Sequence, residues 1–336
     1  MQQCNLFISI PFVVGGADWD TEPTYANTAP AVKRSYLAAV LAEMRGFAGD
    51  APSLEIASVT FGVGSMSTIP ESELREFLGE IKRIFPIEPS TSVHATFDPG
   101  LLSVGQMNEL KAFGLTHLEF RYFTSNFDEA DLLGVPSGET EMKKSAILLE
   151  QAGLERCLMR IALGTVGQTR ATLEKTLRDA LRSAVDGFEL VPLREGWSGA
   201  QSDDDAAVLF EHASRWLGEH GFKSTTPTRF MREGVDDSCH ANAYAPFDGG
   251  DGPATLSFGP STMSAFDGLL WTNVGDINHY IRESADPEAI TERVVELDES
   301  AMEQRRELDV LYREASERLS AKERLRYRQT FERLFS

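Results

Sequence analysis

Five charged or titratable side chains stand at alternate positions of apolar runs that read as buried strands. Glu119 and Arg121 lie two residues apart in one run, and His94, Arg160 and Glu189 lie in three others. Residues two apart on a strand share a face, so we expect all five on the inner face of a barrel. A lone buried charge is costly, so these groups must pair with one another or meet a ligand.

Two interpretations of this polar interior follow. In the first, the charges neutralise one another and fill the barrel. In the second, Arg121 and Arg160, helped by Arg194 just past the sixth strand, bind the carboxylate or phosphate of a small anionic molecule. Glu119 or His94 would then act as the acid or base. Active sites of barrels gather at the carboxyl ends of the strands, which suits this second interpretation.

Glu189 is assigned to the same candidate substrate site as the arginines. A metal ion held by His94, Glu119 and Glu189 is a third interpretation. The sequence shows no ligand spacing that supports it, so we predict no metal ligands.

A glycine-containing turn follows the second predicted strand. Its amide groups would suit an anion, which makes Gly62, Gly64 and Ser65 candidate cofactor-binding residues, although a G-x-G pattern alone is a weak signal. Residues 13–20 contain two glycines and two aspartates, which would suit a cation. We expect this second segment to be an ordinary surface loop.

The elements that position these residues alternate along the chain. Apolar, β-rich runs alternate with amphipathic helical stretches, which predicts a parallel sheet built from βα units. We count six such units and predict an α/β fold, a partial parallel (β/α)6 TIM-like barrel with a C-terminal α/β extension and terminal helices. The runs begin near Asn5, Leu54, Thr91, Leu115, Leu154, Phe188 and Lys223.

Helix boundaries are signalled by individual residues. Pro70 predicts the start of one helix, Thr169 is a candidate N-cap, and Gly114 and Gly153 predict the ends of two others.

Two regions are expected, a barrel over residues 1–231 and an extension over residues 232–336. Residues 232–270 are rich in Gly, Pro and Asp, which indicates loops between short strands. From about residue 298 the chain reads as a charged helix with an apolar stripe. We expect this helix to pack back on the barrel or to mediate self-association, as a homodimer or with a partner protein.

Composition excludes several classes of partner. The 336 residues carry 32 Lys and Arg against 52 Asp and Glu, a formal charge of -20. Such a charge repels nucleic acid and anionic lipid surfaces. No run approaches the ~20 apolar residues that span a bilayer, and the polar start is unlike a signal peptide. We therefore expect a cytoplasmic protein without nucleic-acid or membrane partners.

The cysteines do not have the number or spacing typical of a disulfide framework. The three, Cys4, Cys157 and Cys239, are odd in number and have no C-x-x-C spacing. Neither a disulfide set nor a thiolate zinc site is indicated.

A series of short motifs, in order, resembles the radical S-adenosylmethionine (SAM) family, in the branch of oxygen-independent coproporphyrinogen oxidase and the related heme chaperone. The first motif is Leu6–Phe12, a strand ending in I-P-F. The others lie at residues 62–66, 98–100, 132–134, 164–169, 239–244, 258–261 and 278–280. The resemblance implies a partial barrel that once held SAM and an iron–sulfur cluster.

The chain departs from that family where the cluster would bind. The family's strand runs into C-x-x-x-C-x-x-C, and Val13, Ala17 and Asp20 stand at those three positions. These residues supply no thiolates, so we predict that no iron–sulfur cluster is bound. The positions that bind SAM in the family also differ: they correspond to Thr96, Phe123, Val135 and Arg160.

The resemblance also implies a possible heme site. The chaperone relatives carry H-N-x-x-Y-W, and here His240 and Tyr244 keep their spacing, while Asn is displaced and Trp is missing. His240 and Tyr244 are therefore further candidate cofactor-binding residues, for heme.

Two functions are weighed. The first is a repurposed, non-radical enzyme that acts on a small anionic molecule inside the barrel, in one variant using SAM for group transfer. The alternative is a non-catalytic carrier of heme or another tetrapyrrole, or a partner subunit of an active relative. The rebuilt charged interior favours the enzyme, and the His240 and Tyr244 pair favours the carrier.

Overall fold

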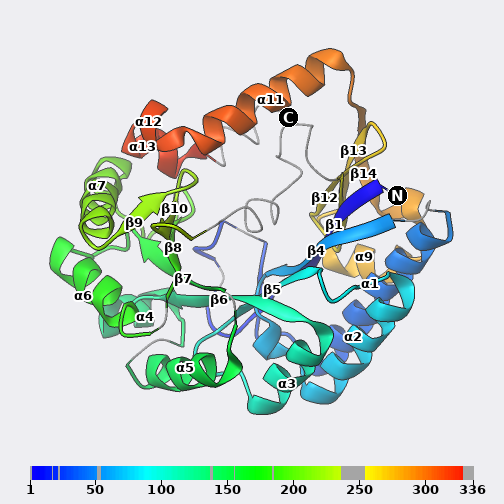
Figure 1. Cartoon of the computed structure of the whole chain (residues 1–336), viewed down its shortest axis with the longest axis horizontal. Coiled ribbons are helices and arrows are strands. Elements are labelled where there is room, and N and C mark those ends of the chain that lie inside the picture. The colour runs from blue at the N-terminus through cyan, green and yellow to red at the C-terminus, as the bar shows by residue number, and fades with distance from the viewer. Residues whose placement is uncertain are drawn as a thin grey trace.

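The fold is known from a computed structural model, which describes residues 2–16, 18–21, 23–50, 54–136, 139–154, 156–183, 185–235 and 254–327. Its centre is a curved sheet in which consecutive strands lie parallel and adjacent, with helices outside (Figure 1). The parallel strands are β1 (Gln2–Ile10), β4 (Leu54–Val63), β5 (Ser92–Phe97), β6 (Leu115–Phe123), β7 (Arg156–Leu163) and β8 (Gly187–Pro192). The predicted partial parallel barrel is confirmed.

The helices cover the outer face of this sheet. They are α1 (Pro30–Asp50), α2 (Glu71–Ile84), α3 (Val104–Phe113), α4 (Phe127–Leu133), α5 (Glu139–Ala152), α6 (Arg170–Ala180) and α7 (Asp203–Glu219), with a 3-10 turn η1 (Met66–Thr68). Leu118, Phe120 and Tyr122 of β6 belong to the main apolar core between strands and helices. Because side chains alternate along a strand, their neighbours Glu119 and Arg121 point into the barrel.

The predicted helix boundaries agree with the structure. Thr169 caps α6 by accepting a hydrogen bond from the amide of Thr172, and Pro70 is the N-cap of α2. Gly114 ends α3 with φ 122°, a conformation that glycine adopts without strain. Gly153, with φ 60°, follows the last residue of α5.

After β8 the sheet continues with antiparallel strands at both of its edges. β9 (Phe222–Ser224) and β10 (Arg229–Arg232) follow β8 on one side. On the other side β11 (Ala254–Phe258) pairs in parallel with β1 and leads into the antiparallel strands β12 (Met263–Phe266), β13 (Leu269–Asn273) and β14 (Thr291–Glu296). Two further strands, β2 (Phe12–Val13) and β3 (Tyr25–Ala26), form a separate pair.

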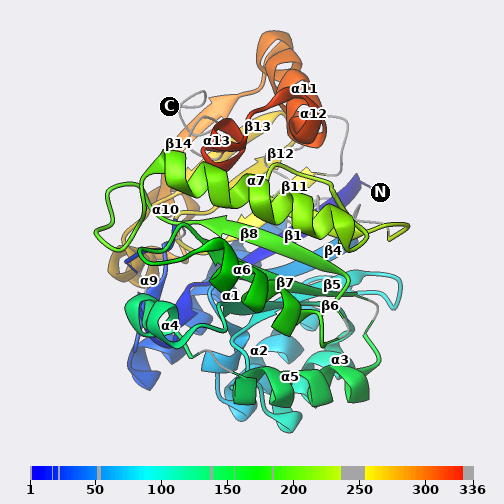
Figure 2. The ribbon, with the colours of Figure 1, turned by 90° about the vertical axis from the view of Figure 1, so that its left-hand side faces the viewer.

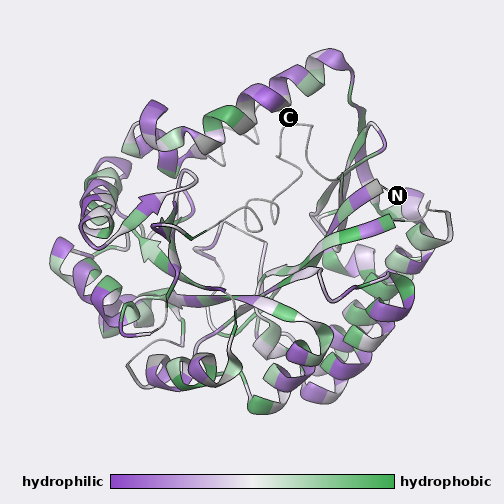
Figure 3. Ribbon diagram, in the orientation of Figure 1, coloured by the Kyte–Doolittle hydropathy of each residue, from purple (hydrophilic) through white to green (hydrophobic). Residues whose placement is uncertain are grey.

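The C-terminal part contains the helices α9 (Ile277–Glu283), α10 (Pro287–Ile290), α11 (Glu299–Arg313), α12 (Ala315–Arg318) and α13 (Ala321–Leu325). This part spans the open side of the curved sheet. In Figure 1 it runs from β14 across to α7, and Figure 2 shows α13 beside α7, as their contacts require. The charged helix predicted from residue 298 is divided into three helices over residues 299–325, the last of which begins at Ser320 with a capping box to Glu323. Figure 3 shows that α11 is mostly hydrophilic.

No helix among the described residues is both long enough and apolar enough to cross a bilayer.

A buried carboxylate joins α1 to the extension. Glu43 accepts hydrogen bonds from the side chain of Asn273 at 2.7 Å, from the amide of Gly259 at 3.0 Å and from the hydroxyl of Tyr280. Burial raises the pKa of Glu43 to about 7, although these three donors favour the ionised form.

The raised pKa of Glu43 predicts a pH-dependent stability. The folded state keeps this proton to about pH 7, whereas an unperturbed glutamate loses it near 4.5, so the stability contribution is present below pH 4.5 and is lost as the pH rises through 7. We expect Glu43 to lower the free energy of unfolding by about 3 kcal/mol between pH 4.5 and 8. Urea unfolding of the parent and of Glu43→Gln at several pH values measures this, with exposed Glu219→Gln as the control. Identical pH dependence in parent and Glu43→Gln would contradict it.

Candidate functional site

Arg121 is the centre of the polar interior at the carboxyl ends of the strands. Its guanidinium forms ion pairs with Asp98 at 3.2 Å and Asp20 at 3.4 Å, and donates to the carbonyl of Val63 at 3.0 Å. The same group lies over the ring of Phe123, 5.0 Å from its centroid. The Arg121 side chain is 1% exposed, and those of Asp20 and Asp98 are 0% and 3% exposed. Arg121 is therefore held by the protein itself.

Asp98 lies just after β5, and its environment is built from several elements. Burial raises the pKa of this carboxyl group, while Arg121 and the hydroxyl of Ser65 act in the opposite direction. The amide of Asp98 donates to the Ser65 hydroxyl at 2.9 Å. Breaking the contact to Arg121 would leave a buried carboxylate without its cation.

Asp20 reaches the interior because the segment after β2 folds inward. Gly15 has φ 98°, and a Cβ atom there would lie 1.6 Å from the carbonyl oxygen of Gly134, so only glycine fits. The amide of Gly16 donates to that same carbonyl at 2.8 Å. The predicted surface loop is wrong for Trp19 and Asp20, which are 1% and 0% exposed.

Two hydrogen bonds of Trp19 hold the segment after β2 against α4 and against the segment after β8. Its indole nitrogen donates to the carbonyl of Leu133, at the end of α4, at 2.8 Å. Its own carbonyl accepts from the amide of Arg194, after β8, at 2.9 Å. The dark blue trace inside the ring of Figure 1 follows this segment. Neutral hydrogen bonds of this kind satisfy polar groups that would otherwise be buried unpaired.

Trp19 also belongs to a second apolar cluster, separate from the main core, which we call the mouth cluster. The ring of Trp19 meets that of Phe123 edge to face, with centroids 4.7 Å apart. Besides Trp19, the buried members come from the ends of β6, β7, β8 and α4, so they occupy the mouth of the barrel. They are Trp19, Phe123, Leu133, Ala162 and Val191, with Val135, Leu193 and Trp197 partly buried against them.

Deeper in the barrel, opposite charges alternate across four adjacent strands. Glu119 lies 3.6 Å from Arg160, and Glu189 lies 2.9 Å from Arg229. Arg160 is also the register partner of Glu189, and Arg229 faces Glu189 across the antiparallel pair of β8 and β10. We call these four residues the interior ion row. Mutual pairing of this kind is what the first interpretation of the interior expects.

His94 is stacked on His117, with ring centroids 4.2 Å apart. Burial lowers the pKa of His94 well below its usual value, and the neighbouring His117 and Arg229 lower it further. Burial and Arg156 lower the pKa of His117 to about 4. Both rings are therefore neutral at neutral pH, where His94 is a poor proton donor.

The turn at residues 62–65 forms backbone hydrogen bonds to residues 10 and 12. The amides of Gly64 and Ser65 donate to the carbonyls of Ile10 and Phe12 at 2.9 and 2.8 Å. A Cβ atom on Gly64 would lie 2.5 Å from both carbonyl oxygens, and one on Gly62 would lie 2.8 Å from the ring of Phe7. Two of the amides expected to face an anion therefore already have partners.

The remaining candidates lie elsewhere. Arg194 lines a separate cavity of about 80 Å³ beneath α13, together with Lys322 and Arg326. His240 and Tyr244 fall outside the described residues, so their assignment stays a prediction. Sequence reasoning missed Arg229 and Trp19. Alternation along Arg229–Arg232 indicates Arg229, whereas no local pattern indicates that Trp19 is buried.

Known proteins of similar sequence or structure indicate which fold this is. No family model matches the chain. The heme chaperone HemW of Bacillus subtilis is 20% identical over 259 residues, 73% of this chain and 67% of HemW. HemW of Lactococcus lactis is 20% identical over 273 residues, 78% of this chain and 69% of its own length. The structure of the radical SAM enzyme HemN, coproporphyrinogen III oxidase of Escherichia coli, matches with a TM-score of 0.82 at 13% identity, over 93% of this chain and 76% of HemN.

This chain has the fold of the radical SAM enzyme HemN and is similar in sequence to the heme chaperone HemW. The motif resemblance to the radical SAM family implies sites for SAM and a [4Fe–4S] cluster. The described residues do not fit either group: Val13 is a buried hydrocarbon, and Asp20 is paired with Arg121. Among the positions that the resemblance matches to SAM-binding residues, Phe123 and Val135 lie in the mouth cluster and Arg160 is paired with Glu119. No group of three His, Cys, Asp or Glu residues suited to a metal occurs in the described ranges.

Removing the central cation should be strongly destabilising. We expect Arg121→Ala to lower the free energy of unfolding by about 3–5 kcal/mol, because it leaves the carboxylates of Asp20 and Asp98 buried without a counter-ion. Arg182→Ala is the matched control, since its side chain is 66% exposed and its partner Asp179 also pairs with Lys175 at 2.7 Å. An ion pair with so exposed a cation is worth roughly 0–1 kcal/mol. Urea unfolding of both variants measures the two losses of unfolding free energy. Equal losses would contradict the role of Arg121 as the counter-ion of Asp20 and Asp98.

Proposed function

We propose that this protein is a non-catalytic, cluster-free protein of the radical SAM fold that carries heme or a related tetrapyrrole. The observation that carries the proposal is the position of Trp19 and Asp20, which fill the mouth of the barrel. A site that performs chemistry on a substrate needs space at the carboxyl ends of the strands. Here an aromatic side chain and a buried ion pair occupy that space.

The pairing of the interior charges supports the same conclusion. Arg121 has two carboxylates and a carbonyl around it, and the interior ion row sets Arg160 beside Glu119. A bidentate anion site would need arginine donors directed toward the ligand. The repurposed-enzyme hypothesis, with a small anionic substrate, is therefore less well supported, and it is the outcome to expect if heme binding fails.

The relatives supply the choice of ligand. Both curated relatives are named heme chaperones, and HemN acts on coproporphyrinogen III. His240 and Tyr244 are the residues that we propose for iron, because a neutral imidazole and a phenolate are both axial ligands of heme proteins. Bound heme would supply colour and an iron centre that those two side chains hold.

Heme titration tests the proposal. We expect hemin to give a saturable Soret band at one equivalent per chain, and His240→Ala to weaken binding about 10-fold or more, because an iron ligand is lost. His220→Ala is the matched control, since that histidine stacks on Trp216 at the surface end of α7. The measurement is absorbance against hemin concentration.

Two results would contradict the heme assignment. One is the lack of any saturable Soret change in the folded parent protein. The other is equal affinity in the parent and in His240→Ala, since hemin would then bind without the proposed ligand.

A further inference from the structure

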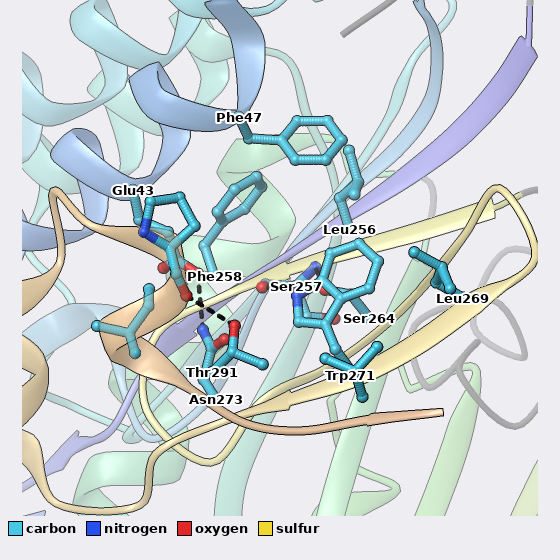
Figure 4. A pocket seen from close by; sticks show the side chains of 13 residues that line it. Glu43, Phe47, Leu256, Ser257, Phe258, Ser264, Leu269, Trp271, Asn273 and Thr291 are labelled. Carbon is cyan, nitrogen blue, oxygen red and sulfur yellow. Dashed lines mark hydrogen bonds between the residues drawn. The ribbon is translucent and has the colours of Figure 1, made fainter. Parts of the chain in front are cut away.

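A pocket outside the barrel lies between α1, the strands β11 to β13 and the segment α10–β14. Its volume is about 200 Å³, which is below the ~300–1,000 Å³ typical of sites for drug-sized ligands. Leu269 and Val294 on its rim are 39% and 56% exposed, so the pocket opens to solvent there. Figure 4 shows Glu43 and Asn273 toward one end, and Leu256, Trp271 and Leu269 toward the other.

Most of the pocket wall is apolar and partly aromatic. Phe47 and Trp271 face it, and Phe258 packs edge to face against Phe47 with centroids 6.5 Å apart. Leu256, Pro287 and Ile290 complete the apolar wall. Aromatic faces carry negative electrostatic potential and attract cations as well as apolar groups.

Glu43 is the only ionisable residue among the 13 that line this pocket. Its hydrogen-bond donors, Asn273, Gly259 and Tyr280, are all uncharged. Oε2 accepts two of those bonds and Oε1 accepts the one from Asn273, and a carboxylate oxygen accepts about two. Oε1 therefore keeps room for one further donor.

We propose that this pocket binds a small organic cation, a primary amine carried on a compact aromatic or apolar body. The ammonium group donates to Glu43 Oε1 and supplies the positive charge that the neutral donors do not, while the body packs against Phe47 and Trp271. This site is independent of the proposed heme function, because neither His240 nor Tyr244 is among its lining residues and its volume is too small for a tetrapyrrole.

Protonation of Glu43 makes binding depend on pH. The pKa of Glu43 is about 7 when the pocket holds no cation, so the carboxylate is mostly protonated at pH 6 and mostly ionised at pH 8. The other titratable groups packed around it are Tyr36 of α1 and Tyr280 of α9, whose pKa values burial raises well above 10. Both tyrosines stay neutral over this range. The strands and the α10–β14 segment contribute no titratable lining residue.

Calorimetric titration with 2-phenylethylamine and its neutral isostere 2-phenylethanol tests the proposal. At pH 8 we expect the amine to bind about 10- to 100-fold more tightly than the alcohol, the usual range for a hydrogen bond to a charged group. From pH 6 to pH 8 the affinity for the amine should rise about 10-fold, since only ionised Glu43 pairs with it, and that for the alcohol should stay constant.

Variants separate the charge from the shape of the pocket. Glu43→Gln should bind the two probes equally, and the exposed Glu219→Gln should behave as the parent. If Glu43→Gln does not fold, the pH series on the parent protein still decides. No binding of the amine at pH 8, equal affinity for the two probes in the parent, or an affinity for the amine that is constant from pH 6 to pH 8 would each overturn the proposal.

Discussion

The buried ion cluster of Arg121 with Asp20 and Asp98 is the interaction on which the rest of this structure depends. A guanidinium that is 1% exposed is tolerated only when anions and carbonyls surround it. Asp98 comes from the end of β5, whereas Asp20 comes from the segment after β2. The cation therefore ties that segment to the centre of the barrel.

Trp19 precedes Asp20 in the chain, so the ion pair of Asp20 also holds Trp19 inside the barrel. The indole of Trp19 in turn fills the barrel mouth. The indole fills the space between Phe123 and the ends of β7 and β8, and its hydrogen bond to Leu133 fixes its orientation. The close contact of Gly15 and Gly16 with Gly134 requires glycines, because any side chain would collide with the backbone. A barrel with the fold of HemN thus has its mouth filled by side chains of the protein itself.

Much of the fold could be predicted from sequence, because it depends on local patterns. Hydrophobic runs located the parallel strands, and alternation placed Glu119, Arg121 and His94 inside the barrel. The partners of those residues could not be predicted in the same way. Arg121 meets a carboxylate 101 residues away in the segment after β2, and Arg229 meets Glu189 across 40 residues, so both contacts depend on how distant parts of the chain come together.

The burial of Trp19 was missed for a related reason. A short run with two glycines and two aspartates is typical of a surface loop, and its local composition contains no sign of Gly134 or Leu133. The resemblance to a metallocofactor family predicts that no thiolates lie in this segment. It did not show that the segment had folded inward to fill the space.

The most direct test of a barrel mouth filled by Trp19 and Asp20 is anaerobic reconstitution of the folded protein with iron and sulfide, followed by Mössbauer spectroscopy. We predict no protein-bound four-iron cluster beyond what a control without Cys4, Cys157 and Cys239 acquires, because the segment after β2 offers no thiolate and is already packed. A stoichiometric [4Fe–4S] signal in the parent protein, absent from that control, would contradict the account.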